Sequence, residues 1–146
     1  MRALIFELRP DAIAEHGLVD ALTRQATALS LRNAVTITVT GPPGRLPLTP
    51  RAEEQAYRIT LEAVHNAVKH ADAGEIRVDV TDLDDAVAVT VTDDGRGFDP
   101  TTPRPGHLGL TSMRERARQI DAELQLSTAS GAGVTVRLTL TARTGR

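Results

Sequence analysis

Two spacings of apolar residues alternate along this chain, and they predict its secondary structure. In some stretches apolar residues recur every three or four positions, as on the buried side of a helix, and in others they alternate with polar residues, as in a half-buried strand. Helical spacing covers residues 11–30, 49–71 and 108–121. Strand-like alternation covers residues 35–41, 75–82, 86–93, 123–129 and 134–142.

Proline and acidic residues mark the boundaries of these elements. Thr49 and Pro50 open the second helix, and the acidic pair Glu53 and Glu54 follows in its first turn, where the helix dipole favours negative charge. The segment "PPGRLPLTP" before it is too rich in proline and glycine for regular structure. Residues 1–9 have the pattern of the end of a helix that Pro10 interrupts.

The order of the elements predicts a fold class. Most strands follow one another through short turns, so we expect a mixed, mainly antiparallel sheet with the helices covering one of its faces. This is an α/β (α+β) two-layer sandwich, with no internal repeat and no linker to divide it. In the last helix the expected buried stripe is Leu108, Leu110, Met113, Ala117 and Ile120.

The composition excludes several classes of function. The net charge is −2 and aromatic residues make up 2%, which argues against nucleic-acid binding through a basic face or through base stacking. The absence of cysteine rules out disulfides and thiolate metal sites. No apolar run approaches the roughly 20 residues of a membrane helix, and the N-terminus lacks the pattern of a signal peptide. We therefore expect a cytoplasmic chain with no direct membrane contact, either as a free protein or as the cytoplasmic part of a membrane-bound protein.

The first cluster that could carry chemistry is "EAVHNAVKHA", residues 62–71. At about 100° per residue, Glu62, Asn66 and Lys69 share one helix face, flanked by His65 and His70. A solvated polar face is the simple interpretation. However, Asn is a weak helix former, and its amide oxygen suits Mg²⁺, with a nearby carboxylate to hold one of the metal's waters. Lys69, the only lysine among 17 basic residues, and His70 could meet phosphate oxygens.

The second cluster is "VAVTVTDDGRGF", in which Asp93 ends a row of three valines on the apolar side of a strand. Burying a carboxylate there is costly without a partner, and a ligand amine could be that partner. Gly95 and Gly97 would allow the backbone to approach a ligand closely. The alternative is a simple Asp-Gly turn, whereas a calcium loop fits the acidic spacing poorly.

The third cluster is "GHLGL", residues 106–110, which leads into the last helix. A glycine-flanked helix N-terminus is a natural phosphate site. It is neither a P-loop nor a dinucleotide fingerprint, so taken alone the motif favours a simple loop-to-helix junction.

In this order and spacing, the three clusters resemble the nucleotide-binding boxes of the GHKL ATPase superfamily, which includes histidine kinases, DNA gyrase, heat-shock chaperones and mismatch-repair ATPases. "EAVHNAVKHA" resembles the N box, "DDGRGF" the first glycine box and "GHLGL" the second. The segments "LRPDAIAEHGLVDAL" and "GHLGLTSMRERA" narrow the resemblance to the nitrate/nitrite-sensor type of histidine kinase. The resemblance covers nearly the whole chain and implies a Bergerat-type sandwich, binding of ATP and Mg²⁺, and phosphoryl transfer to a histidine.

The resemblance also implies roles for the residues of the first cluster. Asn66 would ligate Mg²⁺, and Glu62 would polarise a metal-bound water or assist the transfer. Lys69 and His70 would lie near the phosphates. The expected catalytic residues are therefore Glu62, Asn66 and Lys69.

For the two glycine boxes, the resemblance implies contacts with the rest of the nucleotide. Asp93 would accept a hydrogen bond from the adenine amino group, and Gly95 and Gly97 would shape the adenine pocket. Residues 98–107, which include His107, would form a short ATP lid. Backbone contacts with phosphate at the start of the helix would come from Gly106, Gly109 and Leu110.

The chain departs from the family pattern in two places. Nothing matches the phosphoacceptor histidine, and His16 has the pattern of an exposed structural residue. The resemblance therefore implies a catalytic and ATP-binding domain over residues 10–146, preceded by the end of a dimerisation helix or linker at 1–9. Val134 stands where the family often has a threonine near the adenine, and Thr135 should face the other way.

The expected partners follow from the same resemblance. They are the protein's own dimerisation domain and a cognate response regulator, with a homodimeric full-length protein and a monomeric fragment. Three alternatives stay open: an anti-sigma-factor-type serine kinase, a nucleotide-gated protein-binding module without phosphotransfer, and a related fold that binds no nucleotide. The segment "LRP…GL…AL" speaks against the serine kinase, because it resembles a histidine-kinase linker.

Overall fold

The computed structural model describes residues 17–44, 46–70, 74–95, 108–128 and 133–142 of the chain. Within them, three helices and five strands follow in the order helix, strand, helix, strand, strand, helix, strand, strand. The helices are α3 (Leu18–Asn33), α4 (Pro50–His70) and α5 (Leu108–Gln119). The strands are β1 (Thr36–Thr40), β2 (Glu75–Asp82), β3 (Ala86–Asp93), β4 (Glu123–Thr128) and β5 (Val134–Thr141).

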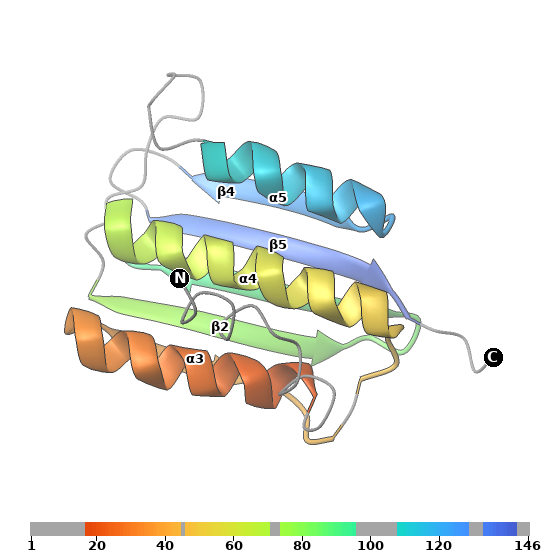
Figure 1. Ribbon diagram of the computed structural model, residues 1–146, viewed down its shortest axis with the longest axis horizontal. Helices are drawn as coiled ribbons and strands as arrows, with labels where there is room; N and C mark the ends of the chain where they lie inside the picture. Colours follow the sequence, from red (N-terminus) through yellow and green to blue (C-terminus); the bar gives the residue numbers. More distant parts are fainter. Residues whose placement is uncertain (1–16, 45, 71–73, 96–107, 129–132, 143–146) are drawn as a thin grey trace, which may run out of the picture.

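The strands form one mixed sheet in the order β1-β2-β3-β5-β4. β1 and β2 are parallel, and α4 is the crossover that parallel neighbours require. The other pairs are antiparallel. Figure 1 shows all three helices lying across the same face of the sheet, with α4 in the middle. This arrangement confirms the predicted two-layer α+β sandwich.

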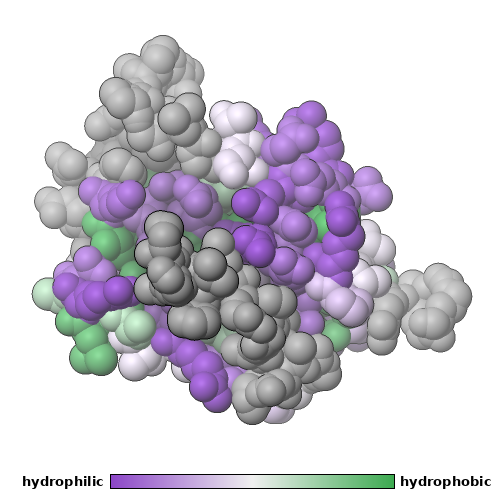
Figure 2. All heavy atoms as spheres, viewed as in Figure 1, coloured by the Kyte–Doolittle hydropathy of each residue, from purple (hydrophilic) through white to green (hydrophobic). Residues whose placement is uncertain are grey.

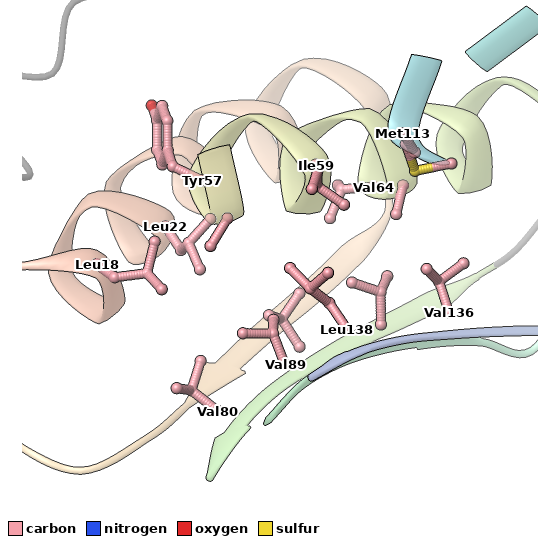
Figure 3. Close-up of a cluster of buried hydrophobic side chains, with 14 of the residues drawn as sticks. Leu18, Leu22, Tyr57, Ile59, Val64, Val80, Val89, Met113, Val136 and Leu138 are labelled. Atoms are coloured by element: carbon pink, nitrogen blue, oxygen red, sulfur yellow. The ribbon is translucent and has the colours of Figure 1, made fainter. Parts of the chain in front are cut away.

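The core lies between this helix layer and the sheet. Figure 3 shows Leu22 of α3, Ile59 of α4 and Met113 of α5 pointing toward Val89 and Leu138 of the sheet, and all five side chains are buried. The helices contribute apolar residues at the 3.6-residue period, and the strands contribute alternate residues. Of the stripe predicted for α5, Met113 and Ala117 are buried and Ile120 is half-buried, whereas the side chains of Leu108 and Leu110 are not described. The apolar stripe expected over residues 11–30 also included Ile13, which lies outside the described residues. Its members within α3 are all buried: Leu18, Ala21, Leu22, Ala26 and Leu29.

The opposite face of the sheet carries polar side chains, many of them threonines. One row crosses all five strands in register and consists of Thr38, Arg77, Thr92, Thr135 and Ser127. These side chains are exposed or half-buried. Threonine combines a β-branched shape with a hydroxyl group that water can solvate, which explains why it is so frequent on this face.

The start of the first helix was predicted wrongly. A continuous helix from Asp11 to about Ser30 was expected, but α3 begins at Leu18 and runs to Asn33. Gly17 has a φ of 92°, a left-handed conformation that a right-handed helix cannot include, so the helix cannot continue back through it. Predictions on residues 1–16, including His16, lie outside the described residues.

The helix-covered surface is mostly hydrophilic (Figure 2). In the described part of the chain, Leu31 and Leu83 are the large hydrophobic residues that stay exposed. No helix among the described residues is long and apolar enough to cross a membrane.

Candidate functional site

Several of the predicted site residues lie at one end of the sheet. α4 ends at His70 and the next described strand begins at Glu75, so the C-terminal turns of α4 lie near the start of β2. In the β2–β3 pair, Ile76 is opposite Asp93, and in the β3–β5 pair Asp93 is opposite Val134. The end of β3 and the start of β5 therefore meet the end of α4 at this edge (Figure 1).

The start of α5 belongs to the same end. Arg116, late in α5, donates a hydrogen bond from Nη1 to Oε1 of Gln55, early in α4, at 3.2 Å. The two helices therefore run in opposite directions, and the first turn of α5 points toward the C-terminal end of α4, as Figure 1 shows. That first turn contains Gly109 and Leu110 and has no acidic residue. Its first N–H groups have no acceptor within the helix, which suits an anion.

Asp93 is the buried acid of this site, as the alternation in β3 predicted. It is 7% exposed and continues the row of Val87, Val89 and Val91, which are all buried. Its Oδ1 accepts the backbone N–H of Gly95 at 2.8 Å, and the backbone N–H of Val134 also donates to this carboxyl group.

The pKa of Asp93 reflects influences that act in opposite directions. Burial raises the pKa of Asp93 above its usual range, because the charged form loses its water. The two backbone donors lower the pKa, and the charge of the neighbouring Asp94 raises it again. A donor on a ligand, such as an amino group, would favour the ionised form and compensate for part of the lost hydration.

Gly133 packs directly against the backbone of Asp93. Its φ is +74°, and a Cβ atom placed on it would lie 2.4 Å from the carbonyl oxygen of Asp93. The carbonyl oxygen of Gly133 accepts a hydrogen bond from Thr128 Oγ1 at 2.9 Å, which ties the end of β4 to the start of β5. Only glycine satisfies both the backbone conformation and the close approach.

Asp94, the second acid of the pair, has a different environment from Asp93. Its side chain is exposed, and its Oδ1 accepts the backbone N–H groups of Gly74 at 2.9 Å and Glu75 at 3.1 Å. Its own backbone N–H donates to the carbonyl oxygen of Glu75 at 3.3 Å. The end of β3 is thus joined to the junction between α4 and β2.

The polar face of α4 has the predicted arrangement. Glu62 and Asn66 are half-buried, Lys69 is exposed, and the opposite stripe, including Ala63 and Val64, is buried in the core. Among the described residues, no group of three or more His, Cys, Asp or Glu side chains could hold a metal ion. A cation at this site would therefore depend on the amide oxygen of Asn66 together with waters and ligand oxygens.

Several predicted contacts lie outside the described residues. Gly97, Gly106 and His107 belong to the undescribed segment between β3 and α5, as does the expected ATP lid. The backbone of His70, Gly109 and Leu110 is helical, but their side chains are not described.

A separate open hollow of about 490 Å³ lies at the other end of the sheet. Ala86, the first residue of β3, lines it, and Asp93 is the last residue of the same strand, so the hollow is remote from the site.

Two residues of the site were not singled out from the sequence. The repeated acid in "DDGRGF" was the available signal for Asp94, but spacing cannot show which backbone groups a second carboxylate will meet. Gly133 was visible in "GAGVT", yet its contact with Asp93 depends on the β3–β5 register.

A buried acid at a strand end, an oxygen-bearing face on the adjacent helix and an open helix N-terminus are the features of a nucleotide-binding domain. The family model of histidine kinase-, DNA gyrase B-, and HSP90-like ATPases matches residues 51–144. The chain therefore belongs to this family, whose nucleotide is ATP, and it is homologous to the ATPase domains of sensor histidine kinases.

Curated relatives give the same picture. The chain is 27% identical over 142 residues to the signal transduction histidine-protein kinase/phosphatase DegS of Brevibacillus brevis, covering 96% of this chain and 36% of DegS. It is 30% identical over 134 residues to the sensor histidine kinase ComP of Bacillus subtilis, covering 90% of this chain and 17% of ComP. The chain thus spans about a third or less of these relatives. The nitrate/nitrite-sensor subtype stays a prediction.

Solved structures confirm the fold. The histidine kinase domain of the blue-light-activated histidine kinase from Erythrobacter litoralis EL346 superposes with a TM-score of 0.73 at 23% identity, over 86% of this chain and 61% of that one. The mycobacterial sensor histidine kinase MprB superposes with a TM-score of 0.63 at 20% identity, over 83% of this chain and 91% of that one.

Proposed function

We propose that this chain is the ATP-binding catalytic module of a two-component sensor histidine kinase. It would bind Mg·ATP and donate the γ-phosphoryl group to a histidine on a dimerisation domain elsewhere in a longer, homodimeric protein. Residues 10–146 would form the module, and residues 1–9 the end of the dimerisation helix or linker. The product would pass its phosphoryl group to a cognate response regulator, and the module would work in the cytoplasm, either free or as part of a membrane-bound sensor.

The observation that carries this proposal is the environment of Asp93. An ionised carboxylate has about four acceptor positions, and backbone N–H groups of Gly95 and Val134 occupy two of them. A buried carboxylate with remaining acceptor capacity, at the end of a strand, suits the amino group of adenine. Val134 lies on the same face of the sheet as its register partner Asp93 and would give the base an apolar contact.

The phosphates would lie between α4 and the start of α5. Lys69 is exposed and free to reach an anion, and the proposed contacts of His70, Gly106, His107, Gly109 and Leu110 would complete the phosphate site. Helix N-terminal N–H groups bind phosphate oxygens without a counter-charge from side chains.

The residues present fit a magnesium ion, which would neutralise phosphate charge when bound. Asn66 offers an amide oxygen on a half-buried helix face, and Glu62, one turn earlier on the same face, offers a carboxylate that could hold a metal-bound water. The role of the protein in the transfer would be mainly to position the nucleotide and balance its charge. Glu62 would orient a water or assist the transfer, and Lys69 would stabilise charge on the phosphoryl oxygens.

Calorimetric titration with ATP, in the presence and absence of Mg²⁺, tests the binding step. We expect the wild type to bind more tightly with Mg²⁺, and Asp93→Asn to weaken binding at least about tenfold, which is the effect of a charge-assisted hydrogen bond. Asp82→Asn, which changes the acid at the far end of β2, is the matched control and should bind as the wild type does. Equal, negligible binding by the wild type and Asp93→Asn would contradict the proposal and favour a fold-mate that binds no nucleotide.

Phosphotransfer needs a separate test. We expect the chain alone to bind Mg·ATP without labelling itself, and the longer protein with its upstream helices to become phosphorylated on histidine. Stable phosphohistidine in the isolated chain would contradict this expectation. The relatives named above favour the histidine kinase over an anti-sigma-factor serine kinase, and binding without any phosphohistidine in the longer protein would favour a nucleotide-gated module.

A further inference from the structure

The junction between α4 and β2 is held by hydrogen bonds from both sides. Asp94 Oδ1 accepts the N–H groups of Gly74 and Glu75, and the carbonyl oxygen of Gly74 accepts the N–H of Thr36 at 3.1 Å. The Asp94 N–H completes the set by donating to the carbonyl oxygen of Glu75. A single exposed carboxylate therefore connects the end of β3 to the start of β2 outside the regular ladder, which begins at the pair of Ile76 and Asp93.

We propose that Asp94 is a positioning residue that fixes the C-terminal end of α4 relative to Asp93, and thereby sets Asn66 and Lys69 at the correct distance from the base. This inference rests on the proposed function, because it assigns Asn66 and Lys69 to the phosphate and metal half of the same site.

The short connection makes this coupling effective. Only residues 71–73 separate the last residue of α4 from Gly74, so the place of Gly74 limits where the helix can end. Asn66 lies about one turn before that end, on a rigid hydrogen-bonded helix. A shift at Gly74 and Glu75 is therefore expected to reach Asn66, whereas Asp93 keeps its own backbone donors and its place in the ladder.

The two successive acids would thus have different roles, Asp93 in base binding and Asp94 in positioning α4. Strand alternation directs Asp93 into the helix-covered side, whereas Asp94 follows the end of β3 and remains exposed. Because Asp94 is exposed, its removal leaves no buried cavity, and its variants should fold.

Three variants of the chain separate positioning from base binding: Asp94→Ala removes the acceptor, Asp94→Asn keeps an oxygen acceptor, and Asp82→Ala is the matched control. Asp82 makes the same kind of bond at the other end of the sheet, since its Oδ1 accepts the N–H of Asp84 at 3.0 Å. The readouts, at fixed pH, are the Kd of adenosine, which reports the base contact, and the Kd of Mg·ATP, which reports the whole site.

We expect Asp94→Ala to raise the Kd of Mg·ATP about tenfold and that of adenosine by no more than about twofold, since a loosened supporting shell weakens the contacts it orients. Asp94→Asn should restore most of the Mg·ATP affinity, and Asp82→Ala should change neither Kd. Any of four results would overturn the inference. These are unchanged Mg·ATP binding in Asp94→Ala, an equal loss of affinity for both ligands, failure of Asp94→Asn to restore affinity, and an equal effect of Asp82→Ala.

Amide hydrogen exchange in the wild type provides a test that does not depend on any variant folding. The N–H groups of Gly74 and Glu75 should exchange slowly, because Asp94 holds both, and fast exchange of both would also overturn the inference. If the wild type itself fails to bind Mg·ATP, the proposed function fails, whatever the exchange of these two amides shows.

Discussion

Replacing Gly133 by alanine should destabilise this domain clearly more than the same replacement at Gly44. Both glycines have left-handed backbone angles, with φ of +74° and +80°. A Cβ atom at Gly133 would meet the carbonyl oxygen of Asp93 at 2.4 Å and its carbonyl carbon at 3.4 Å, whereas a Cβ atom at Gly44 would meet nothing within 4 Å. The pair therefore separates backbone conformation from steric contact.

The magnitudes follow from these two terms. Forcing alanine into the left-handed region costs about 1–2 kcal/mol at either position. Alanine also lowers the entropy of the unfolded chain, a gain of up to about 1 kcal/mol that both variants share. At Gly133 the neighbouring backbone must also move, because the contacting atom belongs to β3, and overpacking of this kind costs about 1–3 kcal/mol. We therefore expect Gly133→Ala to lose about 3 kcal/mol and Gly44→Ala about 1 kcal/mol.

Far-ultraviolet circular dichroism during thermal and urea unfolding measures this difference. The chain has no tryptophan and one tyrosine, so intrinsic fluorescence would report poorly on its unfolding. At about 2–4 °C per kcal/mol for a chain of this size, the melting temperature should fall by roughly 6–12 °C in Gly133→Ala and by roughly 2–4 °C in Gly44→Ala.

The reasoning would be refuted if the two variants lost the same stability within about 0.5 kcal/mol, the usual scatter of surface substitutions. Such a result would mean that the start of β5 does not press against Asp93. Loss of ATP binding in a folded Gly133→Ala variant would support the contact further, because the displaced backbone belongs to the acid that would hold the base.

Three further outcomes are expected from the same structure. Because the folded state raises the pKa of Asp93, its carboxyl group favours stability below the usual aspartate pKa and loses that contribution as the pH rises through the raised value. ATP affinity should fall at acid pH for a different reason, since protonation removes acceptor capacity from the carboxylate proposed to meet the base. The pH titrations of both properties should flatten in Asp93→Asn. Thr49→Ala should cost about 1 kcal/mol in urea unfolding, because Thr49 Oγ1 accepts the N–H of Ala52 at 3.1 Å at the start of α4; no loss would contradict the cap. Met113→Ala should cost about 2–5 kcal/mol by the same measurement, since Met113 is fully buried, and a loss below about 1 kcal/mol would show that the core is not packed as Figure 3 draws it.

The strands could be predicted closely from the sequence because their signal is local. The β2–β3 pair has the predicted limits, residues 75–82 and 86–93, since both strands alternate and the three residues between them form a tight turn. Asp84 has a φ of 75° in that turn, a conformation that aspartate tolerates better than most residues. The burial of Asp93 followed from the same alternation.

Features that depend on contacts between distant segments could not be predicted in this way. Gly17 was read as a residue within a helical pattern, but its left-handed backbone angle sets the start of α3. The bonds of Asp94 join residues about 20 positions apart, and the contact of Gly133 with Asp93 joins residues 40 apart. Neither has a periodic signal, because each depends on the register between strands rather than on a spacing within one.

The topology explains why the site forms at this end of the sheet and not at the other. A helix that connects two parallel strands runs against them, so α4 must deliver its C-terminal face to the start of β2. The β2–β3 hairpin then returns the chain to the same end, where Asp93 and Asp94 stand side by side, and β5 begins next to them with Gly133 just before it. Among the described residues, the opposite end holds the end of β1, the start of α4, the β2–β3 turn, the last turn of α5, the start of β4 and the end of β5. Chain direction therefore brings together Asp93, the acid proposed to meet the base, Asp94, the acid proposed to hold the end of α4, and Gly133, which admits the neighbouring strand. The side chains of α4 then need only the correct helical face to complete the proposed site.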